Sequence, residues 1–287
     1  MRLHDPYMMI RYALINKLTG KPGWEWAKHY LDSDKTLTNM VYAYKASRFL
    51  RNIKFGVKVP QSTRHAIQID NEDGKGLWKQ AMQTEINQLM EYDTFRVLED
   101  DEPLPEGCKF IPYHCIYDVK FDGRRKCRLV AGGHMTDPTT EEVYSGVVSM
   151  ESVRTCFVVA QMNGLEVCAG DVGIAFLNGI TKENVYFRAG PEFGPELEGK
   201  RLVAYKAIYG LKSSSARFHE HFSVSLCKLG FRPSKADPDL WIKTVDDHYE
   251  YIARYVDDVI AFSKHPIAII DELRKTYIMK DVGKPQY

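Results

Sequence analysis

Short apolar runs separated by polar turns dominate the last third of the chain, a pattern that predicts β-strands. Two of these runs, 251–253 and 259–262, flank the tetrapeptide Tyr255-Val256-Asp257-Asp258. Only a tight two-residue turn can join strands so close in sequence, so we predict a β-hairpin with two adjacent carboxylates at its turn. Upstream, residues 240–242 connect to the same hairpin through a turn at Asp246-Asp247-His248, which extends it to a β-meander.

Helices are predicted where apolar residues recur at helical spacing or where capping residues bracket a segment. The spacing of Leu77, Ala81 and Leu89 predicts an amphipathic helix after residue 76. Start and stop signals predict three more helices. These run from Ser149 to Asn163-Gly164, from Ser213-Ser214-Ser215 to about Leu229, and from Pro266 to about Tyr277.

A second hairpin is predicted between residues 116 and 131. Asp122-Gly123 is suited to the positive φ angles of a type I′ turn. Period two then places Arg124, Lys126 and Arg128 on one face of the second strand. A row of cations on a projecting ribbon suits contact with a triphosphate, and it also suits an edge strand that charge protects against aggregation.

A third carboxylate, Asp171, lies between the apolar runs 165–169 and 172–176. If its strand lies beside the Asp257-Asp258 hairpin, three acids converge at one edge of a sheet. Their repulsion is costly unless divalent cations fill the site, and two metal ions ~4 Å apart suit phosphoryl or nucleotidyl transfer. The alternative is a solvated turn, because Asp is a favoured turn residue.

Composition allows one large core, or one domain with an extended arm, because 44% of the 287 residues are hydrophobic. The net charge of +1 gives no argument for nucleic acid, but every charged residue between Asp34 and Asp70 is cationic. Aromatic residues are interleaved with these cations. The stretch can follow a phosphate backbone and stack on bases, or it can be the solvated face of an amphipathic helix.

Other patterns exclude several classes of protein. The six cysteines show no metal-binding spacing, which favours free thiols in a reducing compartment. His219-Glu220-His221 is not a zinc motif, because residues two apart on a helix point away from each other. There is no apolar run of about 18 residues and no secretory signal, so we expect no membrane span.

Six motifs follow one another along the chain: Leu77–Met82, Lys126–Ala131, Tyr144–Val148, Asp171–Gly179, Ala207–Lys212 and Tyr255–Asp258. In this order they resemble the reverse transcriptase of copia-type LTR retrotransposons. The resemblance extends from about residue 77 to residue 287. The resemblance depends on several independent motifs, because the tetrapeptide Tyr255–Asp258 alone is too short to identify the family.

The resemblance implies an α+β fold with the fingers and palm of a right-hand polymerase. The palm would be an antiparallel sheet packed on helices, and the thumb would be absent or incomplete. This domain would span residues 75–287, after a basic arm or linker at residues 1–74. Because the chain stops at Tyr287, we expect no connection or RNase H region and no processive grip on a primer–template.

The resemblance also implies the chemistry. Asp171, Asp257 and Asp258 would be the catalytic residues and the ligands of two Mg²⁺ ions, for which Mn²⁺ can substitute, with Asp258 as an outer or partial ligand. Arg128 matches the triphosphate-binding arginine, and Phe176 matches the aromatic gate that excludes a ribose 2′-hydroxyl. The residues implied to contact the incoming deoxynucleoside triphosphate are Arg128, Lys126, Val172 (through its main chain), Phe176, Tyr209 and Gly210.

The implied partners are an RNA or DNA template with its primer, and other polyprotein segments such as integrase and RNase H. The implied location is a cytoplasmic virus-like particle or the nucleus. Family members commonly have Lys at Gly132, Gln and Pro at Ser213 and Ser215, and Trp at Phe218; these departures bear on substrate affinity and leave the acids intact. Two alternatives stay open: a truncated relic that only binds nucleic acid, and an unrelated metal-dependent phosphodiesterase.

Overall fold

The computed structural model describes residues 53–136 and 143–285. These residues form both α-helices and β-strands, and most of the strands pair antiparallel. The predicted α+β class is therefore confirmed. The chain divides into two compact units, residues 1–61 with 118–124 and residues 62–117 with 125–287. Within the described ranges, no helix is long and apolar enough to cross a membrane.

In the smaller unit, β1 (Ile53–Lys54) and β2 (Val57–Lys58) form a hairpin. The same unit holds the turn predicted at Asp122-Gly123, and the prediction of type I′ is wrong. The Gly123 N–H donates to the Lys120 carbonyl at 2.9 Å, and Gly123 (φ 82°) has a positive φ whereas Asp122 does not. Asp-Gly is equally compatible with a type I turn followed by a left-handed glycine, and that is the turn that forms.

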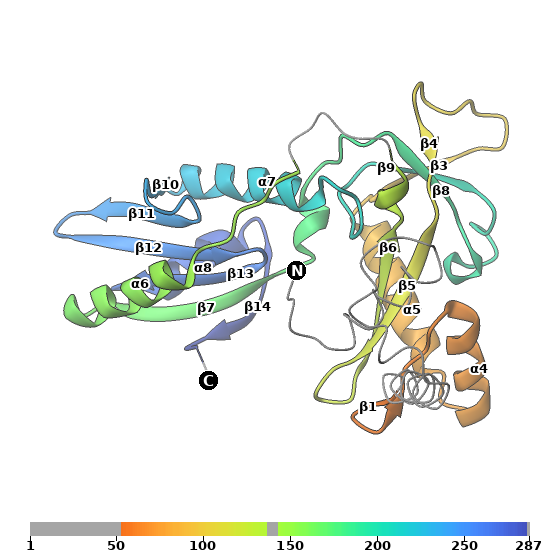
Figure 1. The fold of residues 1–287 in the computed structure, drawn as a ribbon, viewed down its shortest axis with the longest axis horizontal. Helices are drawn as coiled ribbons and strands as arrows, with labels where there is room; N and C mark the ends of the chain where they lie inside the picture. The colour runs from red at the N-terminus through yellow and green to blue at the C-terminus, as the bar shows by residue number, and fades with distance from the viewer. Residues whose placement is uncertain (1–52, 137–142, 286–287) are drawn as a thin grey trace, which may run out of the picture. The chain divides into compact units, whose positions relative to one another are not determined.

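The larger unit contains a six-stranded antiparallel sheet in the order β10-β11-β12-β13-β7-β14 (Figure 1). β11, β12 and β13 are consecutive, so the predicted meander is confirmed. β7, from earlier in the chain, lies between β13 and β14. The strands are β7 (Glu166–Gly173), β10 (Arg232–Pro233), β11 (Leu240–Val245), β12 (His248–Tyr255), β13 (Asp258–Ser263) and β14 (Ile278–Gly283).

Three helices of this unit begin where the sequence predicts. α6 (Met150–Met162) follows Ser149, whose Oγ accepts an N–H of the first turn at 3.2 Å. α7 (Ser214–Lys228) and α8 (Pro266–Arg274) begin as predicted. α8 ends before the predicted Tyr277 because the chain turns after Arg274 to enter β14.

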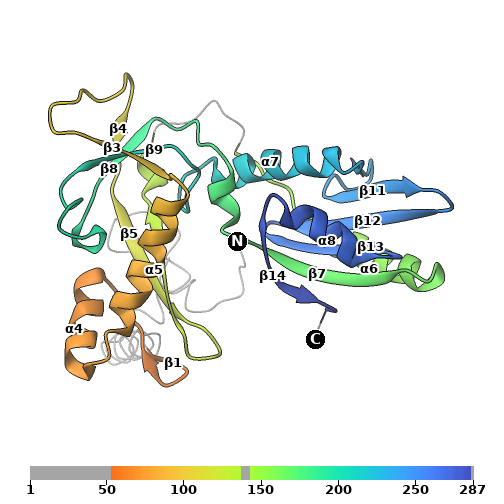
Figure 2. The ribbon, with the colours of Figure 1, turned by 180° about the vertical axis from the view of Figure 1, so that it is seen from behind.

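The six-stranded sheet is buried on both faces by these helices. Ile252 packs in a core with α7 and α8, whereas the next residue, Ala253, packs in a core with α6. α6 lies in front of the sheet in Figure 1, and α8 lies in front of it in Figure 2. Because successive side chains of a strand alternate between faces, each position on these strands can be assigned to the α6 side or to the α7–α8 side.

The rest of the larger unit is built around a four-stranded sheet in the order β3-β9-β8-β4. β6 packs against α5, and residues such as Ile86, Leu129 and Leu202 form their common core. The elements are α5 (Leu77–Glu91), β3 (Phe95–Leu98), β4 (Lys109–Phe110), β5 (Tyr113–Val119), β6 (Arg125–Ala131), β8 (Val185–Arg188) and β9 (Arg201–Ala204).

α4 (Thr63–Asp73) precedes α5, and Asp70 ties the two helices together. Its carboxylate accepts the N–H groups of Trp78 at 3.1 Å and Lys79 at 2.7 Å. The turn-rich junction expected near residue 74 is therefore a short connection between packed helices. The domain boundary expected there stays a prediction, and most of the basic arm lies outside the described residues.

Candidate active site

The predicted hairpin brings two of the three acids side by side. β12 ends at Tyr255 and β13 begins at Asp258, so Val256 and Asp257 form a two-residue turn. On the next strand, β7, Asp171 is the direct partner of Asp258. Directly opposed residues of antiparallel strands have Cα atoms about 4.5–5.5 Å apart and side chains on the same face.

The main chain holds Asp257 at the same edge. The Val172 N–H donates to the Asp257 carbonyl at 2.7 Å. The other turn residue, Val256, has a φ of 57°, a left-handed conformation that is costly for a β-branched residue. Such strain persists only where the surroundings fix it. The structure therefore brings all three acids to one edge of the sheet, with a strained turn between two of them.

Burial and mutual repulsion raise the pKa of two of these carboxyl groups. For Asp171, burial is the larger cause, followed by the charges of Asp257 and Asp258. Burial and the charge of Asp257 raise the pKa of Asp258 as well. A raised carboxyl pKa means that the fold disfavours the ionised form. Any cation placed between these groups is therefore stabilised.

β14 contributes a cation that sequence patterns did not single out. Lys280 is the partner of Asp171 on the other side of β7, and its charge partly offsets the causes that raise the pKa of Asp171. Its side chain passes over Gly173, where an added Cβ would lie 2.7 Å from the Lys280 Cε. The available signal was the strand-like run Ile278–Gly283 after the last predicted helix.

The donor set suits magnesium, although the side chains form no closed cage. Across residues 53–136 and 143–285, no three His, Cys, Asp or Glu side chains are arranged to hold one metal ion. Mg²⁺ usually takes one or two carboxylates and completes its octahedral shell with waters and substrate phosphates. Facing carboxylates with raised pKa values fit that mode of binding. Asp171 together with Asp257 or Asp258 could hold such an ion.

Three of the predicted nucleotide contacts form one stack. The guanidinium carbon of Arg128 lies 4.0 Å from the centre of the Tyr209 ring, and that ring centre lies 4.7 Å from the centre of the Phe176 ring. Phe176 belongs to η3 (Ala175–Asn178), a helical turn directly after β7. Burial raises the pKa of Tyr209, and the charges of the acid cluster contribute. The stack is therefore within electrostatic reach of the acids.

The other predicted contacts lie beside this stack. The Tyr209 carbonyl accepts the Ala131 N–H at 2.7 Å. Gly210 has a φ of 92°, and a Cβ added there would lie 2.1 Å from the Ala131 carbonyl oxygen, so only glycine fits. Lys126 lies two residues before the arginine of the stack on β6. The Val172 side chain is buried, which leaves only its main chain for a ligand.

Glu85 on α5 is a neighbour of this region that sequence analysis missed. Its Oε1 accepts the Leu129 N–H at 3.0 Å and so fixes the main chain beside Arg128. Burial raises the pKa of Glu85, while its bond to Leu129 and the charges of Arg128 and Lys126 lower it. The only signal in the sequence was an acid beside the apolar stripe of the first predicted helix.

The two histidines set aside as a zinc motif have separate partners. The His219 Nε2 lies 3.1 Å from an oxygen of Asp239. The His221 Nδ1 lies 2.9 Å from the hydroxyl of Tyr277. The two histidines therefore point to different partners and do not share a site.

Three of the four positions that depart from the resembled pattern are tightly packed or hydrogen-bonded. Phe218 is buried in the core beside α7. The Ser213 N–H and hydroxyl both donate to Glu183 Oε1, at 2.9 and 2.7 Å. A Cβ added at Gly132 would lie 2.9 Å from the Pro112 carbonyl oxygen, so a lysine there requires the main chain to shift.

Comparison with known proteins gives a consistent result. The family model for reverse transcriptase (RNA-dependent DNA polymerase) matches residues 92–286. The retrovirus-related Pol polyprotein from transposon TNT 1-94 of Nicotiana tabacum is 30% identical over 220 residues, 72% of this chain and 16% of that protein. The Transposon Ty1-ER2 Gag-Pol polyprotein of Saccharomyces cerevisiae is 28% identical over 260 residues, 87% of this chain and 14% of that protein. The chain thus spans about one sixth of the length of these relatives.

Proposed function

This chain belongs to the copia-type reverse transcriptase family, and from that premise we propose that it carries the nucleotidyl-transfer centre of an RNA-directed DNA polymerase. The observation that carries the proposal is the pairing of Asp258 with Asp171 beside the Val256-Asp257 turn. Clustered acids with raised pKa values are typical of functional sites. They suit a reaction in which divalent cations neutralise phosphate oxygens.

In this proposal, the six-stranded sheet and its helices are the palm, and the region around α5 and β6 belongs to the fingers. Asp171 and Asp257 would hold two Mg²⁺ or Mn²⁺ ions, with Asp258 as an outer or partial ligand and the Val172 main-chain oxygen as a further one. When bound, such ions activate the primer 3′-hydroxyl and neutralise charge on the leaving pyrophosphate.

The chain's own residues supply binding and orientation. Arg128 donates to the triphosphate oxygens, and stacking on Tyr209 fixes the plane of its guanidinium group. Lys126 adds a second positive charge on the same strand. Phe176, whose ring lies against the Tyr209 ring at a tilt of 56°, faces the sugar and excludes a 2′-hydroxyl. Gly210 keeps the main chain of the pocket close to β6.

The substrates in this proposal are deoxynucleoside triphosphates and a primed RNA or DNA template, with sequence chosen by base pairing. The named relatives are Pol and Gag-Pol polyproteins. We therefore propose other polyprotein segments, such as integrase and RNase H, as partners. The proposed location is a cytoplasmic virus-like particle or the nucleus.

Primer extension by the 287-residue chain, with Mg²⁺ and deoxynucleotides on a primed RNA template, tests the proposal. Asp257→Asn removes one negative charge and keeps a side chain of nearly the same size and shape. We expect it to lower the extension rate by at least ~100-fold, the scale of losing one electrostatic stabiliser of the transition state. Asp247→Asn, in the other turn of the meander, is the matched control, and we expect it to change the rate by less than about twofold.

Three outcomes are distinguished by this assay. Extension by the parent chain that disappears in Asp257→Asn supports the polymerase. Binding of primer–template by a parent chain that extends no faster than Asp257→Asn indicates a relic and rejects the proposal. Cleavage of nucleic acid without deoxynucleotides indicates a phosphodiesterase, which also rejects it.

A further inference from the structure

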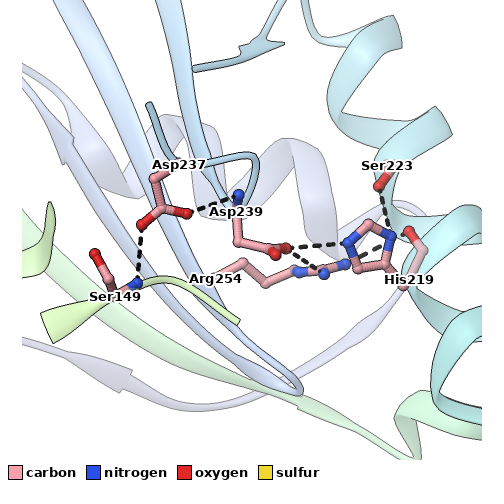
Figure 3. A network of polar contacts seen from close by, with 6 residues as sticks. All are labelled: Ser149, His219, Ser223, Asp237, Asp239 and Arg254. Atoms are coloured by element: carbon pink, nitrogen blue, oxygen red, sulfur yellow. Dashed lines mark hydrogen bonds and ion pairs between the residues drawn. The ribbon is translucent and has the colours of Figure 1, made fainter. Parts of the chain in front are cut away.

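A buried ion pair lies directly beside the Tyr255–Asp258 turn. Arg254 is 1% exposed and Asp239 is 2% exposed, and the guanidinium group donates to Asp239 Oδ1. Figure 3 shows the Arg254 side chain extended toward Asp239, with His219 of α7 close to both. The His219 Nε2 lies 3.1 Å from the same carboxylate oxygen. Buried charges are costly even when paired, so this cluster requires an explanation.

Arg254 is also fixed through its main chain. Its N–H donates to the Asp239 carbonyl at 3.1 Å, and its carbonyl accepts the Val148 N–H at 2.9 Å. Its guanidinium group reaches the His219 carbonyl at 3.5 Å. Three separate segments therefore converge on one residue of β12: the loop before β11, the segment before α6, and α7.

Asp239 is itself held in place from behind. The Asp237 carboxylate accepts the N–H of Asp239 at 3.1 Å and the N–H of Ser149 at 2.9 Å. A Cβ added at Gly146 would lie 2.1 Å from Asp239 Oδ2, so the chain passes closely over that carboxylate. Burial on its own would raise the pKa of Asp239, but the neighbouring histidine and arginine hold it below its usual range. The Asp239 carboxylate is therefore ionised, and its position is fixed by these contacts.

The ion pair and the Asp171–Asp258 pair lie on opposite faces of the sheet. Arg254 shares the face of Ile252, in the core with α7 and α8. Asp258 shares the face of Phe262, in the core with α6, and its partner Asp171 lies on that face too. Arg254 therefore cannot touch a substrate held at the acids. Any effect on the reaction must pass through the main chain of the hairpin.

Stability alone does not explain an arginine at this position. Its Nε is buried and has no hydrogen-bond partner among the described residues, and a well-packed apolar pair usually serves stability as well as a buried ion pair does. Two residues further on, Val256 adopts its left-handed conformation, which requires fixed surroundings. We propose that the Arg254–Asp239 pair is a positioning device that holds this turn so that its acids face Asp171. The inference rests on the proposed function.

The decisive variant replaces both charges with apolar side chains, Arg254→Met with Asp239→Leu, in the full chain. Each single substitution leaves the other charge unpaired or less paired, so we expect its Tm to fall, and the double variant to regain Tm. A positioning role predicts that kcat for primer extension stays lowered ~10–100-fold in the double variant, the scale of orienting residues behind a site. The KM for deoxynucleotide should change less than about threefold. Arg254→Lys, which keeps the positive charge, should retain more of the parent's kcat than Arg254→Met does.

A matched control lies on the same strand and the same face. Glu250, four residues before Arg254 on β12, accepts a buried hydrogen bond from the Ser263 hydroxyl at the far end of the hairpin. Glu250→Met with Ser263→Ala should alter Tm and leave kcat within about twofold of the parent. Amide hydrogen exchange over residues 255–258 is a second readout that needs no catalysis. We expect it to be about tenfold faster in the Arg254/Asp239 double variant and unchanged in the control.

The two proposals fail in different ways. A double variant whose kcat recovers together with its Tm shows that the pair is only structural, which overturns the inference. A parent chain that extends no primer rejects the proposed function instead. In that case the exchange rates decide on the positioning device, and equal rates in the parent and the double variant overturn it.

Discussion

β12 has a two-residue turn at each end, and the two turns share a first residue with a positive φ. Asp246-Asp247 occupies the turn from β11, and Val256-Asp257 occupies the turn to β13, each between directly paired strand residues. The first residue of each is left-handed, with a φ of 38° at Asp246 and 57° at Val256. Aspartate tolerates this conformation, whereas valine does not. The strain is therefore concentrated at the turn beside the acid cluster.

The surroundings of the acids differ more than the turns do. The Asp247 side chain is 77% exposed and lies 3.1 Å from Lys264 and 3.0 Å from His248. The hydrogen bond from Lys264 is the main cause that lowers the pKa of Asp247. Asp258 instead faces Asp171, and its pKa is raised. The fold places a cation against the first turn and a second carboxylate against the second, where the Lys280 charge offsets the repulsion only in part. The second turn is therefore the one that suits an external cation.

The largest expected difference between the two turns is therefore in how their variants respond to Mg²⁺. At a free concentration tenfold above Kd, a bound ion stabilises the folded state by about 1.4 kcal/mol, which raises Tm by roughly 2–3 °C in a chain of this size. We expect this rise in the parent chain and in Asp247→Asn. It should be largely lost in Asp257→Asn, because that variant lacks one of the proposed ligands. Thermal unfolding across a Mg²⁺ titration measures it.

Equal Tm rises in Asp247→Asn and Asp257→Asn would show that the ion binds elsewhere. The contrast between the turns would then concern the protein's own charges only. A titration with Mn²⁺ in the same variants is a useful repeat, since carboxylate and water ligands suit both ions.

Glycine substitutions sharpen the comparison of the backbones. A left-handed conformation costs an L-residue about 1–2 kcal/mol, and glycine in place of another residue costs roughly 0.5–1 kcal/mol in chain entropy. We therefore expect Val256→Gly to raise the free energy of unfolding by up to about 1 kcal/mol, and Asp246→Gly to leave it unchanged or lower. Urea unfolding of both variants measures the difference. A Val256→Gly variant less stable than Asp246→Gly would contradict strain at Val256.

The local features of this fold could be predicted from the sequence. The β-meander and the starts of α6 and α8 follow from turn residues, the Ser149 cap and Pro266, which act on neighbours in the chain. α7 also begins where predicted, although the Ser213 side chain makes no capping bond. The meeting of Asp171 with the hairpin followed from apolar flanks together with family motifs, since spacing alone left it open. The turn at Asp122-Gly123 was mistaken because that dipeptide is compatible with two turn types.

The supporting contacts could not be predicted, because each depends on packing between distant segments. Glu85 and Leu129 are 44 residues apart in the chain, and Asp239 and Arg254 are 15 apart. Lys280 meets Asp171 only because β14 returns to the edge of β7. Periodicity assigns such residues to a helix or a strand, but it does not identify a partner on a distant element.

The smallest expected effect is a pair of opposite shifts in stability with pH. Like charges on facing strands cost about 0.2–1 kcal/mol, so Asp258→Asn should be more stable than the parent at neutral pH by about that amount. Asp247→Asn should be slightly less stable there, because it loses its contacts with Lys264 and His248. Tm measured for both variants between about pH 3 and pH 7 provides the test.

The signs follow from the two pKa directions. The pKa of Asp258 is raised, so its ionisation destabilises the fold: the advantage of Asp258→Asn is complete above the folded pKa and vanishes as pH falls below the ordinary carboxyl value. The pKa of Asp247 is lowered, so its stabilisation is present above the ordinary value and is lost as pH falls through the folded pKa. The two difference curves should therefore have opposite signs at neutral pH and converge in acid. If both differences had the same sign at neutral pH, Asp258 would be paired with a positively charged side chain, as Asp247 is. The electrostatic distinction between the two turns would then be wrong.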